Sequence, residues 1–456
     1  MSKRYFLDSF GCAKNQVDAE NMMAYLAASG WTASPDAGDA DLVIVNSCGF
    51  IEAAKRESIN AVLSWRKEYP GKKILLSGCL ARRYSKELAE SLTEADGFFC
   101  GDDLSALPEA AARVTAAGLP EAGPAAFPRG ETGPAGAGRL LRTGERPLLG
   151  FPGQAYIKIS EGCDNRCSFC AIPLIRGPLS SRLVSDVRSE CKTLLERGVK
   201  EICLIGQDIA SYHPADGGGL CELAGEIASL SGDFWVRFLY LHPDHFPPAL
   251  PLVMRNDSRF LPYFDIPFQH ASFSVLRAMN RKGTAEKYLE LLCRIRDILP
   301  GAVIRSTFLV GFPGETEKDF EALVDFQEKA KFDWLGVFVY SREEGTPAYS
   351  MGKRVAKKTA ENRREVIEKT QTAITEKNMD RFVGRRLAVL VEEELDPGGL
   401  FLGRLFCHAP EVDGAAVIRP AFAENRPAAG PPPQPGDLLP CRVTRRAGFD
   451  LEVISD

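Results

Sequence analysis

Short β-rich runs alternate with helix-like stretches in this chain, and this alternation limits its possible folds more than any other feature. Within about the first 104 residues, three runs each end in a cysteine and each precede a helix-like stretch: YFLDSFGC, DLVIVNSC and KKILLSGC. Alternating strands and helices form parallel sheets with right-handed crossovers. The overall class is therefore α/β, and the sequence predicts an N-terminal parallel α/β domain.

The cysteines that end these runs are Cys12, Cys48 and Cys79, and a glycine stands beside each of them. Ligands of open parallel sheets bind at the carboxyl ends of the strands. The topology therefore predicts that the three thiols lie at one edge, where they could share a metal site. The alternative is that each cysteine is simply a small buried hydrophobe. Spacing alone leaves both interpretations open.

The alternation returns between Ala155 and roughly Lys377, where charged amphipathic stretches separate six β-rich runs. The expected strands are AYIKIS, EICLIG, WVRFLYL, FDIPFQ, VIRSTFLVGF and WLGVFVY. Six such repeats predict a partial (β/α)6 barrel, with its active site at the carboxyl ends of the strands. The first of these runs leads directly into the loop EGCDNRCSFC.

Cys163, Cys167 and Cys170 in that loop have the spacing C-x3-C-x2-C. Iron–sulfur clusters are normally held by four thiolates, so three thiolates predict a four-iron cluster with one iron open to another ligand. A structural zinc site is the alternative, but it usually needs a second C-x2-C or a histidine pair nearby. The nearest histidine is His213, far outside the loop. The spacing therefore favours an iron–sulfur cluster.

Composition predicts a soluble protein of two or three domains, with 456 residues, 45% hydrophobic and 26% charged. No apolar stretch is long enough to span a bilayer, and the N-terminus lacks the apolar core of a signal peptide. Thirteen cysteines, an odd number, argue against a disulfide framework. We therefore expect a cytoplasmic protein with reduced thiols. Its net charge of −5 argues against polyanion binding by the protein as a whole.

The sequence divides into four segments. The α/β domain spans 1–114, a linker spans 115–148, the barrel spans 149–378 and a last domain spans 379–456. Within 115–138, 17 of 24 residues are Ala, Gly or Pro, a composition that cannot build a core. The last segment has short β-rich runs divided by Gly and Pro, which predict a small antiparallel β-barrel.

Motifs along nearly the whole chain resemble those of the methylthiotransferase family of radical S-adenosylmethionine (SAM) enzymes. They are GCAKNQVDAE, VNSCGFIEAAKRESI, SGCLARRY, AYIKISEGCDNRCSFCAIPLIRG, DIPFQHAS, RSTFLVGFPGETEKDFE and VFVYSREEGTPA. The motif APEVDG looks like the TRAM-domain signature of one branch, the RimO type. GCAKNQVD and DIPFQHAS also favour this branch over the tRNA-modifying MiaB branch.

The resemblance implies two 4Fe–4S clusters and SAM as cofactors. Cys163, Cys167 and Cys170 match the SAM-cleaving cluster, and Phe169 matches the aromatic position of the same motif. The three strand-end cysteines match the auxiliary, sulfur-carrying cluster: Cys12, Cys48 and Cys79. Each cluster would keep one iron open to an outside ligand.

The resemblance also implies the reaction. One SAM would methylate a sulfur atom on the auxiliary cluster, and a second SAM would be cleaved to a radical that takes hydrogen from a substrate carbon. The substrate of the RimO type is the β-carbon of an aspartate in small-subunit ribosomal protein twelve. The chain would then be a transferase that uses two SAM per turnover, with its cofactors performing the radical step.

Four further side chains are candidate SAM contacts. Gln207 and Asp208 follow the second barrel strand, where related enzymes hold the SAM amino group, although a polar turn explains them equally well. Arg305 could pair with the SAM carboxylate, and Gln269, with its neighbour His270, lies at the barrel mouth. The GFPGET sequence is better explained as a structural turn. Lone histidines are more often structural, so three are left out of the site: His242, His245 and His408.

The last segment offers one physical discriminator between substrates. From Asp380 to Asp456 there are nine Arg and no Lys against twelve Asp plus Glu, a net charge of −3. Phosphate contacts dominate nucleic-acid affinity, so an acidic module, with Glu392, Glu393 and Glu394 in one run, favours a basic ribosomal protein. The alternative is that this run is only a solvated strand edge.

Two other function classes stay open. One is a methylthiotransferase that acts on tRNA adenosine, as in the MiaB type. The other, more remote, is a non-catalytic iron–sulfur carrier, which would not need a three-cysteine loop with an open iron. The expected partners are small-subunit ribosomal protein twelve, free or in the subunit, and a flavodoxin or ferredoxin-type electron donor. We expect no membrane contact, and nucleic-acid contact only through the ribosome.

Overall fold

The computed structural model describes residues 3–116, 125–127, 145–396, 399–419 and 433–455. The chain divides into two compact units, each of which combines segments that are distant in the sequence. Unit 1 contains Met1–Leu149, Lys158–Arg182 and Ser341–Tyr349. Unit 2 contains Gly150–Ile157, Leu183–Tyr340 and Ser350–Asp456. The cysteine loop EGCDNRCSFC therefore belongs to the same unit as the N-terminal sheet.

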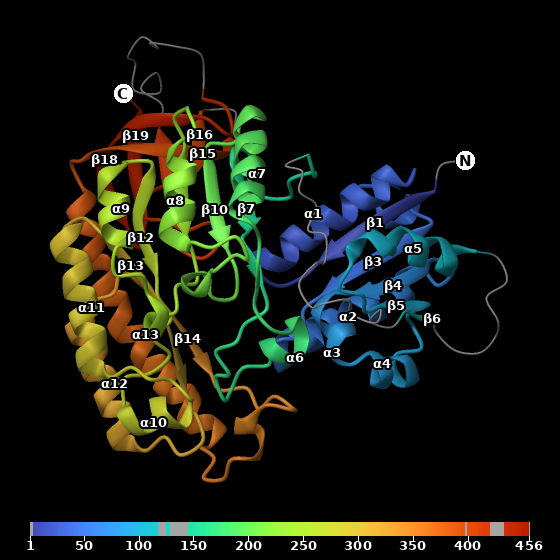
Figure 1. Ribbon diagram of the computed structural model, residues 1–456, viewed down its shortest axis with the longest axis horizontal. Coiled ribbons are helices and arrows are strands. Elements are labelled where there is room, and N and C mark those ends of the chain that lie inside the picture. The colour runs from blue at the N-terminus through green and yellow to red at the C-terminus, as the bar shows by residue number, and fades with distance from the viewer. Residues whose placement is uncertain (1–2, 117–124, 128–144, 397–398, 420–432, 456) are drawn as a thin grey trace. The chain divides into compact units, whose positions relative to one another are not determined.

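Unit 1 is built on a parallel six-stranded sheet in the order β2-β1-β3-β4-β5-β6 (Figure 1). Its strands are β1 Arg4–Ser9, β2 Thr32–Ala33, β3 Leu42–Ser47, β4 Lys73–Ser77, β5 Gly97–Phe99 and β6 Ala125–Phe127. Its helices are α1 Ala13–Ala28, α2 Glu52–Glu68, α3 Gly78–Arg83, α4 Ser85–Ser91 and α5 Leu107–Thr115, with one-turn helices η1 Ala37–Asp39 and η2 Leu104–Ala106. The N-terminal parallel α/β domain is confirmed.

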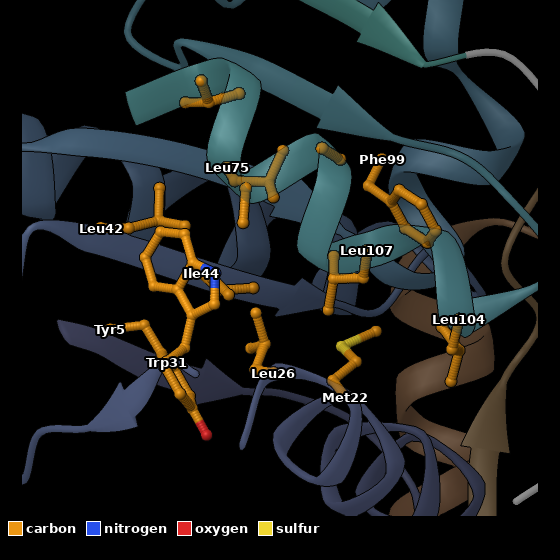
Figure 2. Packing of buried hydrophobic residues seen from close by; sticks show 13 residues of the cluster. Tyr5, Met22, Leu26, Trp31, Leu42, Ile44, Leu75, Phe99, Leu104 and Leu107 are labelled. Carbon is orange, nitrogen blue, oxygen red and sulfur yellow. The ribbon is translucent and has the colours of Figure 1, made fainter. Parts of the chain in front are cut away.

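Helices cover both faces of this parallel sheet, so its strands carry apolar side chains on both sides. Leu26 of α1 and Leu107 of α5 pack on one face against Ile44 of β3, as Figure 2 shows. Val62 of α2 belongs to the cluster on the other face, together with side chains of α3 and α4. Helices on both faces hold the sheet rigidly, so its carboxyl edge is a fixed platform.

The predicted linker 115–148 lies mostly outside the described residues. Within it, the structure describes residues 115–116, 125–127 and 145–148. Residues 125–127 form strand β6, which pairs in parallel with β5 at the edge of the sheet. Sequence reasoning did not expect this strand, because an Ala-Ala-Phe run among Gly and Pro has no strand pattern of its own.

Two short strands flank the cysteine loop in unit 1: β8 Ser160–Glu161 and β9 Ser180–Ser181, which pair antiparallel. Helix α6, Ile172–Arg176, lies between them. The third segment of unit 1 contributes the single turn η5, Pro347–Ser350, whose last residue falls in unit 2.

Unit 2 contains the six-stranded sheet β14-β13-β12-β11-β10-β7, in which the pairings from β10 through β14 are all parallel (Figure 1). Its strands are β7 Gln154–Lys158, β10 Glu201–Ile205, β11 Trp235–Phe238, β12 Phe260–Asp265, β13 Val303–Val310 and β14 Trp334–Val339. This is the predicted partial barrel.

Helices alternate with these strands: α7 Val184–Glu196, α8 Leu220–Ala228, α9 Leu250–Asn256, α10 Phe273–Ala278, α11 Ala285–Ile298, α12 Glu317–Ala330 and α13 Lys357–Met379. Single turns are η3 Ile209–Ser211, η4 Pro243–His245 and η6 Asp380–Phe382. Figure 1 shows α8, α9, α11 and α12 running alongside the strands. Among the described residues, no helix is long and apolar enough to cross a membrane.

The fourth strand of this sheet begins earlier than the sequence predicts. The expected run FDIPFQ starts at Phe264, whereas β12 spans Phe260–Asp265 and contains Pro262. Proline cannot donate to a strand ladder and argues against a central strand. The structure accommodates it through a register shift against β11, between Val236 and Phe238. A bulge of this kind leaves no pattern in the sequence.

The C-terminal segment closes into a five-stranded barrel in the order β15-β16-β17-β19-β18. Its strands are β15 Arg386–Asp396, β16 Leu400–Leu405, β17 Ala416–Arg419, β18 Leu438–Ala447 and β19 Asp450–Ser455. The small barrel is confirmed, with one parallel pair, β17 with β19, among antiparallel ones. Five strands in a closed ring cannot alternate direction throughout, so one parallel pair is unavoidable.

A buried ion network fastens this barrel to the amino ends of the unit 2 strands. Glu201, the first residue of β10, accepts from Arg237 Nε at 2.7 Å and pairs with Arg404 Nη1 of β16 at 2.6 Å. Arg404 also pairs with Glu392 of β15. All four side chains are at least 95% buried. The barrel is therefore packed firmly on the sheet, at the end opposite the carboxyl ends of its strands.

This network changes the meaning of the acidic run in β15. Glu392 is buried against Arg404, whereas Glu393 and Glu394 are exposed. Glu392 thus belongs to the interior and contributes nothing to a substrate-facing surface. The sequence could not distinguish it from its neighbours, because the burial arises from a β16 residue twelve positions later.

Candidate active site

The three N-terminal cysteines lie at the carboxyl edge of the unit 1 sheet. Cys12 caps α1 after β1, Cys48 directly follows β3, and Cys79 lies in the first turn of α3 after β4. These strands are neighbours in the sheet. A Cβ added to Gly11 would lie 3.0 Å from Cys48 Cβ. The fold thus brings three thiols from three loops to one edge, where ligands of parallel sheets bind.

The thiols also influence one another electrostatically. Burial raises the pKa of Cys48 to about 11, and nearby Cys79 and Cys12 add to the increase. At Cys12, whose side chain is exposed, loss of hydration opposes ionisation. The charge of Lys14, a hydrogen bond from Asn15 N–H and the charge of Arg176 together lower the pKa of Cys12. Metal ligation requires thiolates, so it is coupled to loss of the Cys48 proton.

The spacing of the sulfur atoms discriminates between a single ion and a cluster. Thiolates on one zinc ion lie at most about 4.6 Å apart, because each Zn–S bond is about 2.3 Å. Across the described residues, the only trio of His, Cys or acidic side chains with ligand atoms within 4.8 Å of one another contains no cysteine. In neither cysteine triad do all three sulfur atoms lie within 4.8 Å of one another. Ligands to separate irons of a cubane fit this wider arrangement.

We expect Gly78→Ala to disrupt the auxiliary cysteine site. Gly78 has φ +87°, and an added Cβ would lie 2.5 Å from the Ser47 carbonyl oxygen. Forcing a side chain there should cost about 1–3 kcal/mol from backbone strain alone. It should also displace the loop of Cys79. Thermal unfolding and iron content after reconstitution measure the two effects. Gly71→Ala is the control, since its Cβ would meet no atom within 4 Å. Equal Tm and iron content in the two variants would contradict this prediction.

The loop of the second triad folds back on itself. Gly177 carbonyl accepts from Cys163 N–H at 3.2 Å, and Cys167 carbonyl accepts from Cys170 N–H at 3.0 Å. A Cβ on Gly162 would lie 2.0 Å from Pro178 carbonyl oxygen, so only glycine fits before Cys163. All three thiols, and Phe169, are partly exposed. The loop thus holds three accessible thiols in a fixed turn.

A buried ionic cluster lies at the base of this loop. Asp18 of α1 accepts from Lys158 Nζ at 2.5 Å and from Arg176 Nη1 at 2.6 Å. Glu161 pairs with the same two cations. Although burial opposes it, the charges of Arg176 and Lys158 hold the pKa of Asp18 well below its usual range. This cluster joins α1, next to Cys12, to both ends of the loop that carries Cys163.

Arg176 continues from this cluster to the first triad. Its Nη2 lies 2.6 Å from Asn15 Oδ1 and 3.1 Å from Cys79 Sγ. Sequence reasoning missed Arg176, Asn15 and Asp18. The available signal was weak. Asn15 and Asp18 stand three apart on one face of a helix, and Arg176 is the last residue but one of the motif AYIKISEGCDNRCSFCAIPLIRG.

The third segment of unit 1 adds a second buried carboxylate. Glu343 accepts from Arg83 Nη1 at 2.7 Å and from Lys55 Nζ at 3.0 Å. Five residues further on, Ala348 N–H donates to Ser168 carbonyl oxygen in the cysteine loop at 2.8 Å. The motif VFVYSREEGTPA thus supplies contacts to both the N-terminal α/β domain and the cysteine loop EGCDNRCSFC.

Of the predicted SAM contacts, Phe169 lies in unit 1 on the cysteine loop, whereas Gln207, Asp208 and Gln269 lie in unit 2, after the carboxyl ends of β10 and β12. Asp208 follows β10 and accepts from Ser211 Oγ at 2.7 Å, and its Oδ2 lies 3.0 Å from His245 Nδ1. Asp208, His242 and His245 place one ligand atom each within 4.8 Å of one another. Burial and the nearby positive charge of Arg281 lower the pKa of His242. The same positive charge disfavours a metal cation between these three side chains. Hydrogen bonds within this cluster hold the Asp208 carboxylate in place. Gln207, the other candidate after β10, precedes it in the chain.

Gln269 and Arg305 lie in different surroundings. Gln269, with φ +70°, exchanges backbone hydrogen bonds with Thr307 and Leu309, and bridges β13 beyond the end of β12. Arg305, the third residue of β13, lies 3.2 Å from Asp265 and 3.4 Å from Asp413 of the C-terminal barrel. Its guanidinium is therefore ion-paired on the side of that barrel, and its contact with SAM stays a prediction.

The GFPGET turn is held by its own glutamate. Glu315 accepts from Gly311 and Phe312 backbone N–H groups and pairs with Arg363 of α13 at 3.0 Å. Gly311 has φ +76°, and its Cβ would lie 2.5 Å from Ala360 Cβ. These contacts explain the turn and the glycine at position 311 by structure alone.

Three family models match successive parts of the chain. They are Uncharacterized protein family UPF0004 over residues 4–100, the Radical SAM superfamily over 157–326 and the TRAM domain over 383–454. Among solved structures, the radical SAM methyltransferase TsrM from Kitasatospora setae has TM-score 0.56 at 16% identity, covering 76% of this chain and 75% of that one. This likeness shows the fold. Together the matches and the fold define a radical SAM enzyme.

Curated relatives match over almost the full length. "Ribosomal protein uS12 methylthiotransferase RimO" of Treponema denticola is 46% identical and covers 98% of this chain and 100% of its own. The protein of the same name from Carboxydothermus hydrogenoformans is 40% identical, covering 93% and 94%. The chain belongs to the RimO family of radical SAM methylthiotransferases. It is a transferase whose cofactors are SAM and two 4Fe–4S clusters.

Proposed function

We propose that this chain methylthiolates the β-carbon of an aspartate in ribosomal protein uS12 and consumes two SAM molecules per product. The observation that supports this most is that one compact unit holds two cysteine triads, joined through Arg176. Two triads suit a reaction that needs both a radical and a sulfur source. The names of the full-length relatives support uS12 as the substrate.

The two triads take separate roles in this proposal. Cys163, Cys167 and Cys170 hold the SAM-cleaving cluster, and the other triad holds the sulfur-carrying cluster: Cys12, Cys48 and Cys79. When bound, these clusters and SAM supply the radical chemistry and the sulfur. Three thiolates per site, none gathered around a single ion, fit two cubanes with one open iron each.

In this proposal SAM is contacted by Phe169, Gln207, Asp208, Gln269 and Arg305. Phe169 lies beside the third loop cysteine, while Gln207, Asp208 and Gln269 follow barrel strands. Asp208 is held by Ala210 N–H at 3.0 Å and by Ser211 Oγ. A carboxylate fixed in this way is already oriented for the ammonium group of SAM, so little entropy is lost on binding.

The partners follow from the same assignment. The C-terminal barrel recognises the substrate, either free uS12 or uS12 in an assembling subunit. A flavodoxin or ferredoxin-type protein provides the electrons, and the reaction takes place in the cytoplasm, where uS12 is made. Segment boundaries at 1–114, 149–378 and 379–456 are part of this proposal.

One observation favours tRNA as a second candidate substrate. Arg386 of β15 and Arg442 of β18 face each other across the barrel ladder, and both are exposed. Cross-strand arginines can contact phosphates, so the substrate assay includes tRNA.

We expect reconstituted protein, supplied with reductant, SAM and uS12, to form 5′-deoxyadenosine and S-adenosylhomocysteine in amounts equal to the product. The first reports radical cleavage and the second reports methyl transfer. Peptide mass spectrometry after the reaction locates the methylthio group. Product on adenosine of added tRNA, with uS12 unmodified, would replace the proposal by the tRNA candidate. A product without S-adenosylhomocysteine would contradict the two-SAM scheme.

A further inference from the structure

We propose that Arg176 is a positioning residue that donates a hydrogen bond to the Cys79 thiolate and thereby fixes the geometry and raises the reduction potential of the auxiliary cluster. The same side chain connects the loop of Cys163, Cys167 and Cys170 to that cluster site. This inference rests on the proposed function in one respect, namely that Cys12, Cys48 and Cys79 hold a cluster.

The contacts of Arg176 leave its guanidinium one orientation. Nη2 reaches Cys79 Sγ at 3.1 Å and Asn15 Oδ1 at 2.6 Å, while Nη1 reaches Asp18 Oδ2 at 2.6 Å. The side chain is 2% exposed. A planar fork whose two ends are both bonded cannot rotate without losing several of these contacts at once. Arg176 therefore holds Cys79 Sγ in a defined place.

Asn15 extends this hold to the other two cysteine loops. Its Nδ2 donates to Ser47 carbonyl oxygen at 2.9 Å, immediately before Cys48, and to Phe10 carbonyl oxygen at 2.9 Å, two residues before Cys12. Its Oδ1 lies 3.3 Å from Cys79 Sγ. One amide thus touches all three loops, and Arg176 fixes the oxygen of that amide.

Arg176 also connects to the loop that carries Cys163, Cys167 and Cys170. Arg176 ends α6, six residues after Cys170, while Lys158 and Glu161 precede Cys163. Asp18 binds Arg176 and Lys158 together, so both ends of the loop are bound to α1 through one carboxylate. A shift of either group of cysteines therefore changes the contacts of the other group, through Arg176 and Asp18.

The redox consequence follows from the direction of the hydrogen bond. A reduced cluster carries one more negative charge, and donors to its sulfur ligands stabilise that charge, which raises the reduction potential. Asp18 and Glu161 neutralise much of the arginine charge. What remains is a directed N–H···S contact, which lysine cannot reproduce together with the contacts to Asn15 and Asp18.

The test uses the full chain carrying Cys163→Ala, Cys167→Ala and Cys170→Ala, so that bound iron reports the auxiliary site alone. Iron content and an EPR-monitored redox titration are compared for this chain and for three derivatives. These are Arg176→Met, Arg176→Lys, and Arg176→Met with Asp18→Asn. The double change removes the cation together with its buried carboxylate, so that no uncompensated charge is left inside. Arg56→Met, at an exposed helical position, is the control.

We expect the midpoint potential to fall in Arg176→Met and in the double variant, to fall less in Arg176→Lys, and to stay unchanged in Arg56→Met. Loss of iron in Arg176→Met, with iron retained at a lowered potential in the double variant or in Arg176→Lys, also supports the proposal. An unchanged potential in an iron-loaded Arg176→Met or double variant overturns it. Absence of iron from the parent chain would instead overturn the cluster assignment of Cys12, Cys48 and Cys79.

Discussion

Replacing Cys167 by alanine is expected to abolish SAM cleavage, whereas replacing Cys48 by alanine should leave cleavage largely intact and stop methylthio transfer. The reason is that the two thiols belong to different triads, on the loop after β7 and at the end of β3. Removing one of only three thiolates should cost the cluster that it holds. Production of 5′-deoxyadenosine and of methylthiolated substrate, measured in the same reaction, separates the two functions.

Cys191→Ala is the matched control for these variants. Cys191 is fully buried on α7 and belongs to neither triad. Its replacement should leave both products at wild-type levels once the protein is folded. Wild-type methylthio transfer by Cys48→Ala would show that the auxiliary site is elsewhere. Loss of both products in Cys191→Ala would show that the assay reports folding rather than chemistry.

The second large effect concerns the ion network between the sheet and the C-terminal barrel. Glu201→Ala leaves Arg237 and Arg404 buried without their shared carboxylate. Breaking a buried pair by removing one partner typically costs about 3–5 kcal/mol, because an uncompensated charge stays inside. We expect the unfolding transition of unit 2 to lose stability by that amount, as measured in urea. Glu393→Ala, exposed on β15, should change it by less than about 0.5 kcal/mol.

The same network gives a pH dependence with a defined sign. Burial opposes ionisation of Glu201, but the charges of Arg404 and Arg237 outweigh it and lower its pKa. Its contribution to stability is therefore fully present above the unfolded glutamate pKa, about 4.3. It is lost as pH falls through the lower folded value. A broken buried ion pair costs far more than about 1 kcal/mol. If Glu201→Ala loses less than that at pH 7, the network is solvated and does not hold the barrel on the sheet.

The parts of the fold that the sequence predicts are those with a local pattern. The runs ending in Cys12, Cys48 and Cys79 alternate with helices, so their common edge follows from parallel topology alone. The C-x3-C-x2-C loop is likewise a local spacing. These patterns predict the sheet, the partial barrel, the small closed barrel and the two groups of cysteines.

What the sequence could not predict depends on contacts between distant residues. The sequence places Glu392 in an acidic surface run, whereas the structure buries it against Arg404. The ion pair between Arg305 and Asp413 likewise has no signal in the sequence. Arg176 has no pattern that joins it to Cys79, 97 positions away. Pro262 made the first residues of β12 look unlike a strand. The register shift that accommodates this proline involves the neighbouring strand β11, so it leaves no local pattern. Such features are set by packing rather than by local sequence.

The central claim, methylthiolation of uS12, is tested most directly by the intact mass of that protein from cells with and without this gene. The account predicts a species that has gained one CH3S in place of one hydrogen, present only when the gene is present. Fragmentation should place the group on an aspartate. An unchanged uS12 mass, together with loss of methylthio-adenosine from the tRNA of cells lacking the gene, would contradict the account and make tRNA the substrate.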